Sequence, residues 1–178
     1  MEYITEPATI ERRSMQLISP YLEKYGLPLA EEKLYSRIIH ASGDVDYAPI
    51  IRIKKVVASG LAALRKRKNI FNDVEMVRTG INKKRLAQYG GQVHCLIANA
   101  PTALFQLIEM MEIKQIRPTL IIGVLVGFVG GKESKKKLVD LSPGPYITVD
   151  GNKGGSPIAA AIVNALLYML ERSRPWKQ

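Results

Sequence analysis

The chain has 178 residues and a net charge of +10, and it is 47% hydrophobic and 24% charged. These values fit one globular domain with a buried core, and they exclude a disordered or repeat protein. A single cysteine excludes an intramolecular disulfide, and together with two histidines it offers too few ligands for a zinc or iron–sulfur site. We expect one domain over residues 1–178, in a cytoplasmic protein without a metal site.

The apolar segments are too short to cross a membrane. The longest, residues 120–129 and 158–163, fall well below the roughly 20 residues that a spanning helix needs. The N-terminus carries Glu2 and Glu6 and lacks the apolar stretch of a secretion signal. We therefore expect a soluble protein without a membrane partner.

Two helices are predicted at the start of the chain. Apolar residues recur at helical spacing over residues 6–25, a segment that contains Ser14 and stops before Gly26 and Pro28. A second helical stretch covers residues 31–41. Gly43 and Asp44 form turns readily, which places His40 in the last turn of that helix.

Short β-branched segments alternate with helical ones through the rest of the chain. Strands are predicted at residues 50–53, 70–71, 93–97, 120–129 and 146–149. The segment 120–129 is nearly all aliphatic, which is typical of a strand buried on both faces. Helices are predicted at residues 56–64 and 101–113, and a last, buried helix starts with Ser156 as N-cap and Pro157 at its first position and ends near Leu170.

This alternation predicts an α/β sandwich with a mainly parallel sheet and helices on both faces. In such sheets ligands bind beyond the carboxyl ends of the strands. The loops at Asn99, Gly127 and Gly151 fall at those ends, so the functional site is expected there.

Three segments there share one design, a strand followed by a loop rich in Gly or Asn and then a helix start. They are residues 98–102, 127–134 and 151–156. Free backbone N–H groups at helix starts favour an anion. The alternative is that the glycines only turn the chain and that Ser156 only caps a helix.

The positive charge includes two tight runs, residues 65–68 and 135–137, whose simplest interpretation is the solvated end or face of a helix. A basic surface attracts anions without specifying which. A nucleic-acid-binding module is one alternative, but the chain has no recognisable motif for it and no basic stripe interleaved with aromatic residues. We expect no nucleic-acid partner.

Common catalytic motifs are missing. A P-loop fails at both ends around Gly131-Lys132, where Val126 and Glu133 stand in place of Gly and Ser or Thr. No dinucleotide fingerprint, nucleophile elbow or zinc-protease helix occurs. Proton chemistry near neutral pH is left to histidine. His94 lies in a predicted strand, where a core histidine bonded to backbone is expected, and His40 is either a helix-end residue or a catalytic one.

Six ordered motifs resemble the precorrin-8X methylmutase family, over residues 10–167. They are Ile39-His40-Ala41-Ser42-Gly43-Asp44, Asp73-Val74-Glu75-Met76-Val77, Asn99-Ala100-Pro101-Thr102-Ala103-Leu104, Val126-Gly127-Phe128-Val129, Glu133-Ser134-Lys135 and Gly154-Gly155-Ser156. Six motifs in one order are far more specific than any single motif.

The resemblance implies a flavodoxin-like, three-layer α/β/α fold and a homodimer with the site near the subunit interface. It implies that a methyl group moves from C-11 to C-12 of a corrin precursor, without an external cofactor. It also implies that His40 is the catalytic acid/base and that Ser14 touches the substrate. A [1,5] sigmatropic shift needs no nucleophile or metal, so one proton donor aimed at a ring nitrogen is the help that counts.

The implied substrate carries many carboxylates, which suits a basic protein. The candidate substrate-binding residues are those of the loops and the nearby cations: Arg12, Arg13, Arg37, Asn99, Thr102, Lys132, Lys153, Gly154, Gly155 and Ser156.

The chain departs from the family in two places. Between Gly80 and Asn99 it lacks much of a segment that normally contributes a Thr-Arg pair to the pocket, and Leu125 replaces a proline. This motivates a second hypothesis, a tetrapyrrole carrier or scaffold of the same pathway that binds without isomerising.

Overall fold

The computed structural model describes residues 5–95 and 100–172 as a mixed α/β protein. Its helices are α1 Pro7–Leu22, α2 Leu29–Ser42, α3 Val56–Arg65, α4 Glu75–Gly80, α5 Lys83–Ala87, α6 Ala100–Glu112, α7 Gly131–Leu141 and α8 Ser156–Arg172. Its strands are β1 Ile51–Lys54, β2 Ile70–Asn72, β3 Val93–Cys95, β4 Ile121–Gly123 and β5 Tyr146–Val149, and 3₁₀ turns cover η1 Glu23–Tyr25 and η2 Val45–Ile50.

The strands form two small sheets. The first has the order β1-β5-β4, with β4 parallel and β1 antiparallel to β5, and the second pairs β2 and β3 in parallel. The predicted α/β fold class is confirmed. The expectation of one mainly parallel sheet is corrected: β1 follows the short η2 connection and enters from the opposite direction, so the first sheet is mixed.

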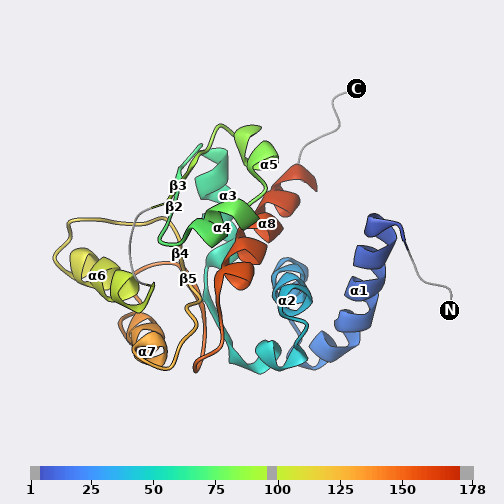
Figure 1. Ribbon diagram of the computed structural model, residues 1–178, viewed down its shortest axis with the longest axis horizontal. Coiled ribbons are helices and arrows are strands. Elements are labelled where there is room, and N and C mark those ends of the chain that lie inside the picture. Colours follow the sequence, from blue (N-terminus) through green and yellow to red (C-terminus); the bar gives the residue numbers. More distant parts are fainter. Residues whose placement is uncertain (1–4, 96–99, 173–178) are drawn as a thin grey trace.

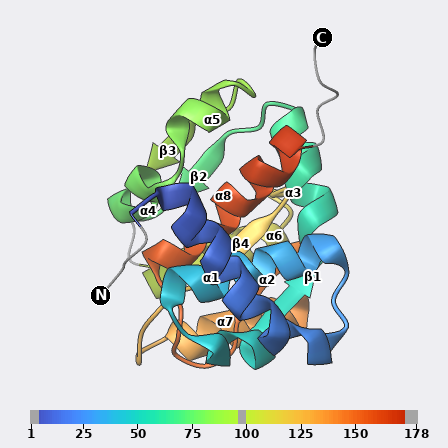
Figure 2. The ribbon, with the colours of Figure 1, turned by 90° about the vertical axis from the view of Figure 1, so that its right-hand side faces the viewer.

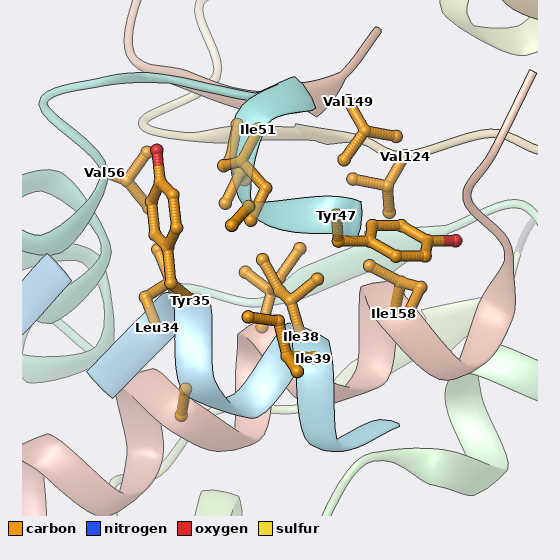
Figure 3. Packing of buried hydrophobic residues seen from close by; sticks show 14 of the residues in the cluster. Leu34, Tyr35, Ile38, Ile39, Tyr47, Ile51, Val56, Val124, Val149 and Ile158 are labelled. Atoms are coloured by element: carbon orange, nitrogen blue, oxygen red, sulfur yellow. The ribbon is translucent and has the colours of Figure 1, made fainter. Parts of the chain in front are cut away.

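The central strand β5 is buried on both faces, and successive side chains alternate between two cores. Ile147 and Val149 pack with α2 and α8, whereas Tyr146 packs with α6 and α7. Figure 1 shows α6 and α7 on one side of β4 and β5, with α8, α2 and α1 on the other. Figure 3 shows the α2 side, where Ile38 and Ile39 lie beneath Ile51 and Val149.

Helix α8 lies in the middle of the molecule, as its apolar sequence predicts. It packs against α2, α3 and α4, and residues of its other face join a core with α3, α4, α5 and the β2–β3 sheet. Figure 2 shows α1 as the outermost helix on its side, lying across α2. In the described part of the chain, none of the helices combines the length and apolar character of a membrane span.

Two of the predicted boundaries that differ from the structure lie next to the loops after β4 and β5. The segment 120–129 is a strand only at Ile121–Gly123, and Phe128 and Val129 are 87% and 88% exposed. Hydrophobicity alone does not separate a buried strand from an apolar loop. Helix α8 begins at Ser156, one residue before the predicted first position, Pro157. The Gly155 carbonyl accepts from the N–H of Ala159, so Gly155 rather than Ser156 is the N-cap residue.

Candidate active site

The site forms where the parallel strands β4 and β5 end. Because their carboxyl ends share one edge, the β4 loop, residues 124–130, and the β5 loop, residues 150–155, run side by side. Gly155 N–H donates to the Val124 carbonyl at 2.7 Å, and Gly127 N–H donates to the Asn152 carbonyl at 3.2 Å. Two of the three predicted loops are thus joined by backbone hydrogen bonds.

The loops approach so closely that only glycine fits at position 154. A Cβ there would lie 2.3 Å from the Val124 oxygen and 2.5 Å from the Leu125 oxygen. The Gly154 φ of +146° is also one that L side chains rarely adopt. Gly154 therefore has a packing role that its sequence motif did not reveal.

Lys135 of α7 donates hydrogen bonds to the backbone of both loops. Its side chain is 1% exposed, and its Nζ donates to the Leu125 carbonyl at 2.8 Å and to the Lys153 carbonyl at 2.7 Å. Burial lowers the pKa of Lys135 to about 8. The prediction that residues 135–137 form a solvated face is wrong for this residue and holds for Lys136, which pairs with Asp140.

A cleft of about 560 Å³ opens beside these loops. It is lined by the end of α2, by η2, by both loops and by the start of α8: Ala41, Ser42, Asp44, Tyr47, Val126, Phe128, Asn152, Lys153, Gly154, Pro157 and Ile158. This volume lies within the range of small-molecule sites, and most of the lining is apolar with a few polar groups.

His40 immediately precedes this lining and is exposed in the last turn of α2. Two carbonyls near the helix end accept hydrogen bonds from groups other than this imidazole. Gly43 N–H donates to the Ile39 carbonyl at 2.8 Å, and the Ser42 hydroxyl lies 3.0 Å and 3.1 Å from the Ile38 and Ile39 carbonyls. The His40 imidazole takes no part in these hydrogen bonds.

An ion pair ties the β5 loop to the chain just after α2. The Lys153 ammonium bonds the Asp44 carboxylate and lies 5.4 Å from the centre of the Tyr47 ring. The hydrogen bond from Lys153, followed by one from the Asp46 N–H, lowers the pKa of Asp44, and the same bond raises the pKa of Lys153. The predicted cation Lys153 does line the cleft, but with a carboxylate as its partner.

Gly154 also lines the cleft, whereas the other described site residues, His40 included, lie outside its lining. Ser14 is half-buried on α1, where Arg12 and Arg13 are exposed. Arg37 pairs with Glu11 and stacks over the Tyr168 ring at 4.5 Å, which gives it a structural role between α1, α2 and α8.

Thr102 and Lys132 are exposed in the first turns of α6 and α7. These helix starts are neighbours, because a Cβ on Gly130 would lie 3.2 Å from Pro101. Gly155 and Ser156 stand at the start of α8, beside the cleft residue Pro157. Asn99 lies outside the described residues.

The second histidine takes no part in the cleft. His94 is half-buried and stacks on Phe71, with the ring centres 5.2 Å apart, and its Nε2 has no hydrogen-bond partner among the described residues. Residues 5–95 and 100–172 contain no group of three or more His, Cys, Asp or Glu side chains suited to a metal ion.

Sequence reasoning missed Tyr47 and Lys135. Lys135 shares a helix face with Gly131, Ser134 and Leu138, all buried, so helical periodicity could have marked it as inward-facing. Tyr47 carries no comparable signal in the sequence. Its place in the cleft follows from the η2 turn, which connects His40's helix to β1.

An apolar cleft with a few polar groups, at the carboxyl ends of parallel strands and at the end of a helix that carries an exposed histidine, is the arrangement of an α/β enzyme site for a small molecule. The chain belongs to the precorrin-8X methylmutase family, whose profile matches residues 9–100 and 96–169.

Relatives of this family align over almost the whole chain. It is 34% identical to the cobalt-precorrin-8 methylmutase of Salmonella typhimurium over 216 positions, covering 97% of this chain and 100% of that protein. It is 36% identical to the precorrin-8X methylmutase of Pseudomonas aeruginosa, covering 93% and 97%. The crystal structure of the Thermus thermophilus precorrin-8X methylmutase superposes with a TM-score of 0.86 at 27% identity, covering 93% and 97%.

The matches also locate a missing segment. The Salmonella alignment has more positions than this chain has residues, and the two profile matches meet at residues 96–100. The relatives therefore carry residues at this point that this chain lacks. The position agrees with the shortening noted between Gly80 and Asn99.

Proposed function

We propose that this chain is a tetrapyrrole isomerase of cobalamin biosynthesis. It moves a methyl group from C-11 to C-12 of precorrin-8X or cobalt-precorrin-8, giving hydrogenobyrinic or cobyrinic acid. The observation that carries the proposal is family membership over nearly the whole chain, together with a cleft that the family motifs themselves build. Motifs around residues 39–44, 126–129 and 154–156 meet there from distant parts of the sequence.

His40 is the acid/base of this reaction. Its family motif supports the assignment, as does its exposed position on α2, whose last residues Ala41 and Ser42 line the cleft. Histidine is a general acid and base, so His40 can protonate a ring nitrogen and take the proton back. The migrating methyl group itself needs no covalent partner on the protein.

The carboxylates of the substrate meet the helix starts and lysines around the cleft. Lys153, Gly154, Gly155 and Ser156 lie at or beside the cleft, and Thr102 and Lys132 lie at the neighbouring helix starts, so these residues form one group of contacts. Asn99, which lies outside the described residues, is included as a contact on its family motif alone. Ser14, Arg12 and Arg37 form a second group on α1 and α2.

The second group reaches the substrate in a homodimer whose interface lies near the site. Support comes from exposed apolar residues on two surfaces. Ile10, Leu17 and Tyr21 form an exposed stripe on α1 beside Ser14, and Phe128 and Val129 project from the β4 loop. Isolated exposed apolar residues are ordinary, but a stripe along one helix face favours a partner.

The proposal also covers the domain organisation, the fold type and the cellular location of the protein. Residues 1–178 form a single domain of flavodoxin-like, three-layer type, which the helices on both faces of β4 and β5 support. The protein is cytoplasmic, in keeping with its single cysteine.

The test is incubation of the purified protein with precorrin-8X, metal-free and cobalt-bound, followed by absorption spectroscopy. The proposal predicts conversion of at least one form, seen as a change in the visible spectrum. Tight binding of the product without turnover would instead identify a carrier. Absence of both binding and turnover would refute the assignment.

A further inference from the structure

The polar side chains of the cleft differ in what they can still offer a ligand. The Ser42 hydroxyl is used at the end of α2, where it contacts three carbonyls and accepts from the Asp44 N–H. Asp44 and Lys153 are paired with each other. The Tyr47 hydroxyl, by contrast, accepts a hydrogen bond from Gly154 N–H at 3.1 Å and donates none within the described chain. Its own proton is therefore available to a ligand.

The Tyr47 hydroxyl is held firmly in place. The residue is only 6% exposed, because its ring packs in the core beside Val124 and Ile158. Figure 3 shows the ring between these two side chains, with the hydroxyl pointing away from Ile38 and Ile39. A hydroxyl on a buried, rigid ring loses little entropy when it binds a ligand.

Lys135 fixes the peptide group that donates to Tyr47. The Lys153 carbonyl points down to the Lys135 Nζ at 2.7 Å, and in a trans peptide the N–H of the following residue, Gly154, points the opposite way. That N–H is the one that meets the Tyr47 oxygen. A buried cation thus polarises a peptide, which in turn orients the phenol and makes it a better donor.

We propose that the Tyr47 hydroxyl is a substrate contact, which donates a hydrogen bond to a carboxylate of the bound molecule. This rests on the proposed function, in which the substrate is a polycarboxylate tetrapyrrole. A hydrogen bond from a hydroxyl to a carboxylate is short and strong. The Lys153 ammonium lies beside the same ring and is shared with the Asp44 carboxylate.

The test compares Tyr47→Phe with Tyr35→Phe, two substitutions that each remove one hydroxyl from a buried ring. Tyr35 is 7% exposed and belongs to the same core, but it does not line the cleft. With precorrin-8X as substrate, Tyr47→Phe is expected to raise KM by about tenfold or more, and to leave kcat nearly unchanged, because the contact is made in ground and transition state alike. Tyr35→Phe is expected to leave both constants unchanged.

A second measurement separates a contact from a packing effect. Binding of the free-acid product and of its methyl ester is titrated with both variants, whose folding is checked by thermal unfolding. Tyr47→Phe is expected to weaken binding of the acid much more than that of the uncharged ester. If Tyr47→Phe weakened binding of acid and ester equally, or left KM unchanged, the inference about Tyr47 would be overturned. Turnover by the wild type would still support the proposed function in that case. A wild-type protein that neither binds nor converts the tetrapyrrole would overturn the proposed function.

Discussion

At the scale of single residues, the account depends most on His40. Replacing it with alanine removes the proton donor but no contact that holds α2, because Ser42 and Gly43 cap the helix end. We expect kcat to fall by about 10²–10⁴-fold with substrate binding retained. Steady-state kinetics measure kcat, and a titration with the product measures binding. His94→Gln is the matched control because it alters the other histidine. Turnover by His40→Ala at the wild-type rate would show that another group transfers the proton.

Gly154 provides a steric prediction. An alanine Cβ at this position would lie 2.3 Å from the Val124 oxygen, on backbone that L residues avoid. We expect Gly154→Ala to lower the free energy of unfolding by about 3–5 kcal/mol, the sum of overpacking and backbone strain. Gly151→Ala is the control, since its φ is also positive but no atom lies within 4 Å, and about 1–2 kcal/mol is expected there. Denaturant unfolding that gives equal losses would contradict the close packing of the two loops.

At the scale of elements, α7 is linked to the site through one buried lysine. The pKa of Lys135 is about 8 in the folded chain against a usual value near 10.5, so between these values the unfolded chain binds more protons than the native one. The free energy of unfolding contributed by this group therefore rises with pH across that window, by at most about 1.4 kcal/mol per pH unit. This contribution is lowest below pH 8, where the native state must bury the charged form of Lys135.

Lys135→Met removes this ionisation and keeps most of the side-chain volume. We expect the wild type to gain stability relative to the variant as the pH rises from about 8 to 10. Urea unfolding of both proteins at several pH values measures the difference, in which the titration of shared groups cancels. Parallel pH profiles would mean that the lysine is not desolvated in the folded chain.

The sequence predicted the helices and strands that have a clear period or punctuation. Helix α2 ends at Ser42 and is capped by Gly43, whose φ is +67°, as the turn residues indicated, and the apolar segment after the β5 loop forms the buried helix α8. The predictions failed where tertiary contacts decide. The burial of Lys135 depends on carbonyls from two loops, and the exposure of Phe128 depends on β4 ending at Gly123.

The candidate site was predicted in the same uneven way. The loops of β4 and β5 could be placed together because parallel strands end at one edge. Arg37 could not be assigned, because its partner Glu11 comes from the packing of α1 on α2 and nothing in its own segment indicates that contact. Tyr47 reaches the cleft only because η2 turns the chain back toward the β5 loop, where its hydroxyl meets Gly154.

At the scale of the whole molecule, the proposed homodimer uses the apolar stripe on α1. Leu17 is 57% exposed at its centre, so Leu17→Asp would place a charge in an apolar interface. We expect sedimentation velocity to give the mass of two 19.8 kDa chains for the wild type and of one for the variant. Ile113→Asp, at a residue 65% exposed just beyond α6, is the control that should stay dimeric. A monomeric wild type would remove the dimer and with it the route by which Ser14 reaches the substrate.

The most direct test of the whole account is a crystal structure of the protein with hydrogenobyrinic acid bound. We predict that the macrocycle occupies the cleft at the ends of β4 and β5, with a ring nitrogen within about 2.6–3.2 Å of the His40 imidazole, directly or through one water. A product bound away from this cleft, or with no ring nitrogen within reach of His40, would contradict the central claim.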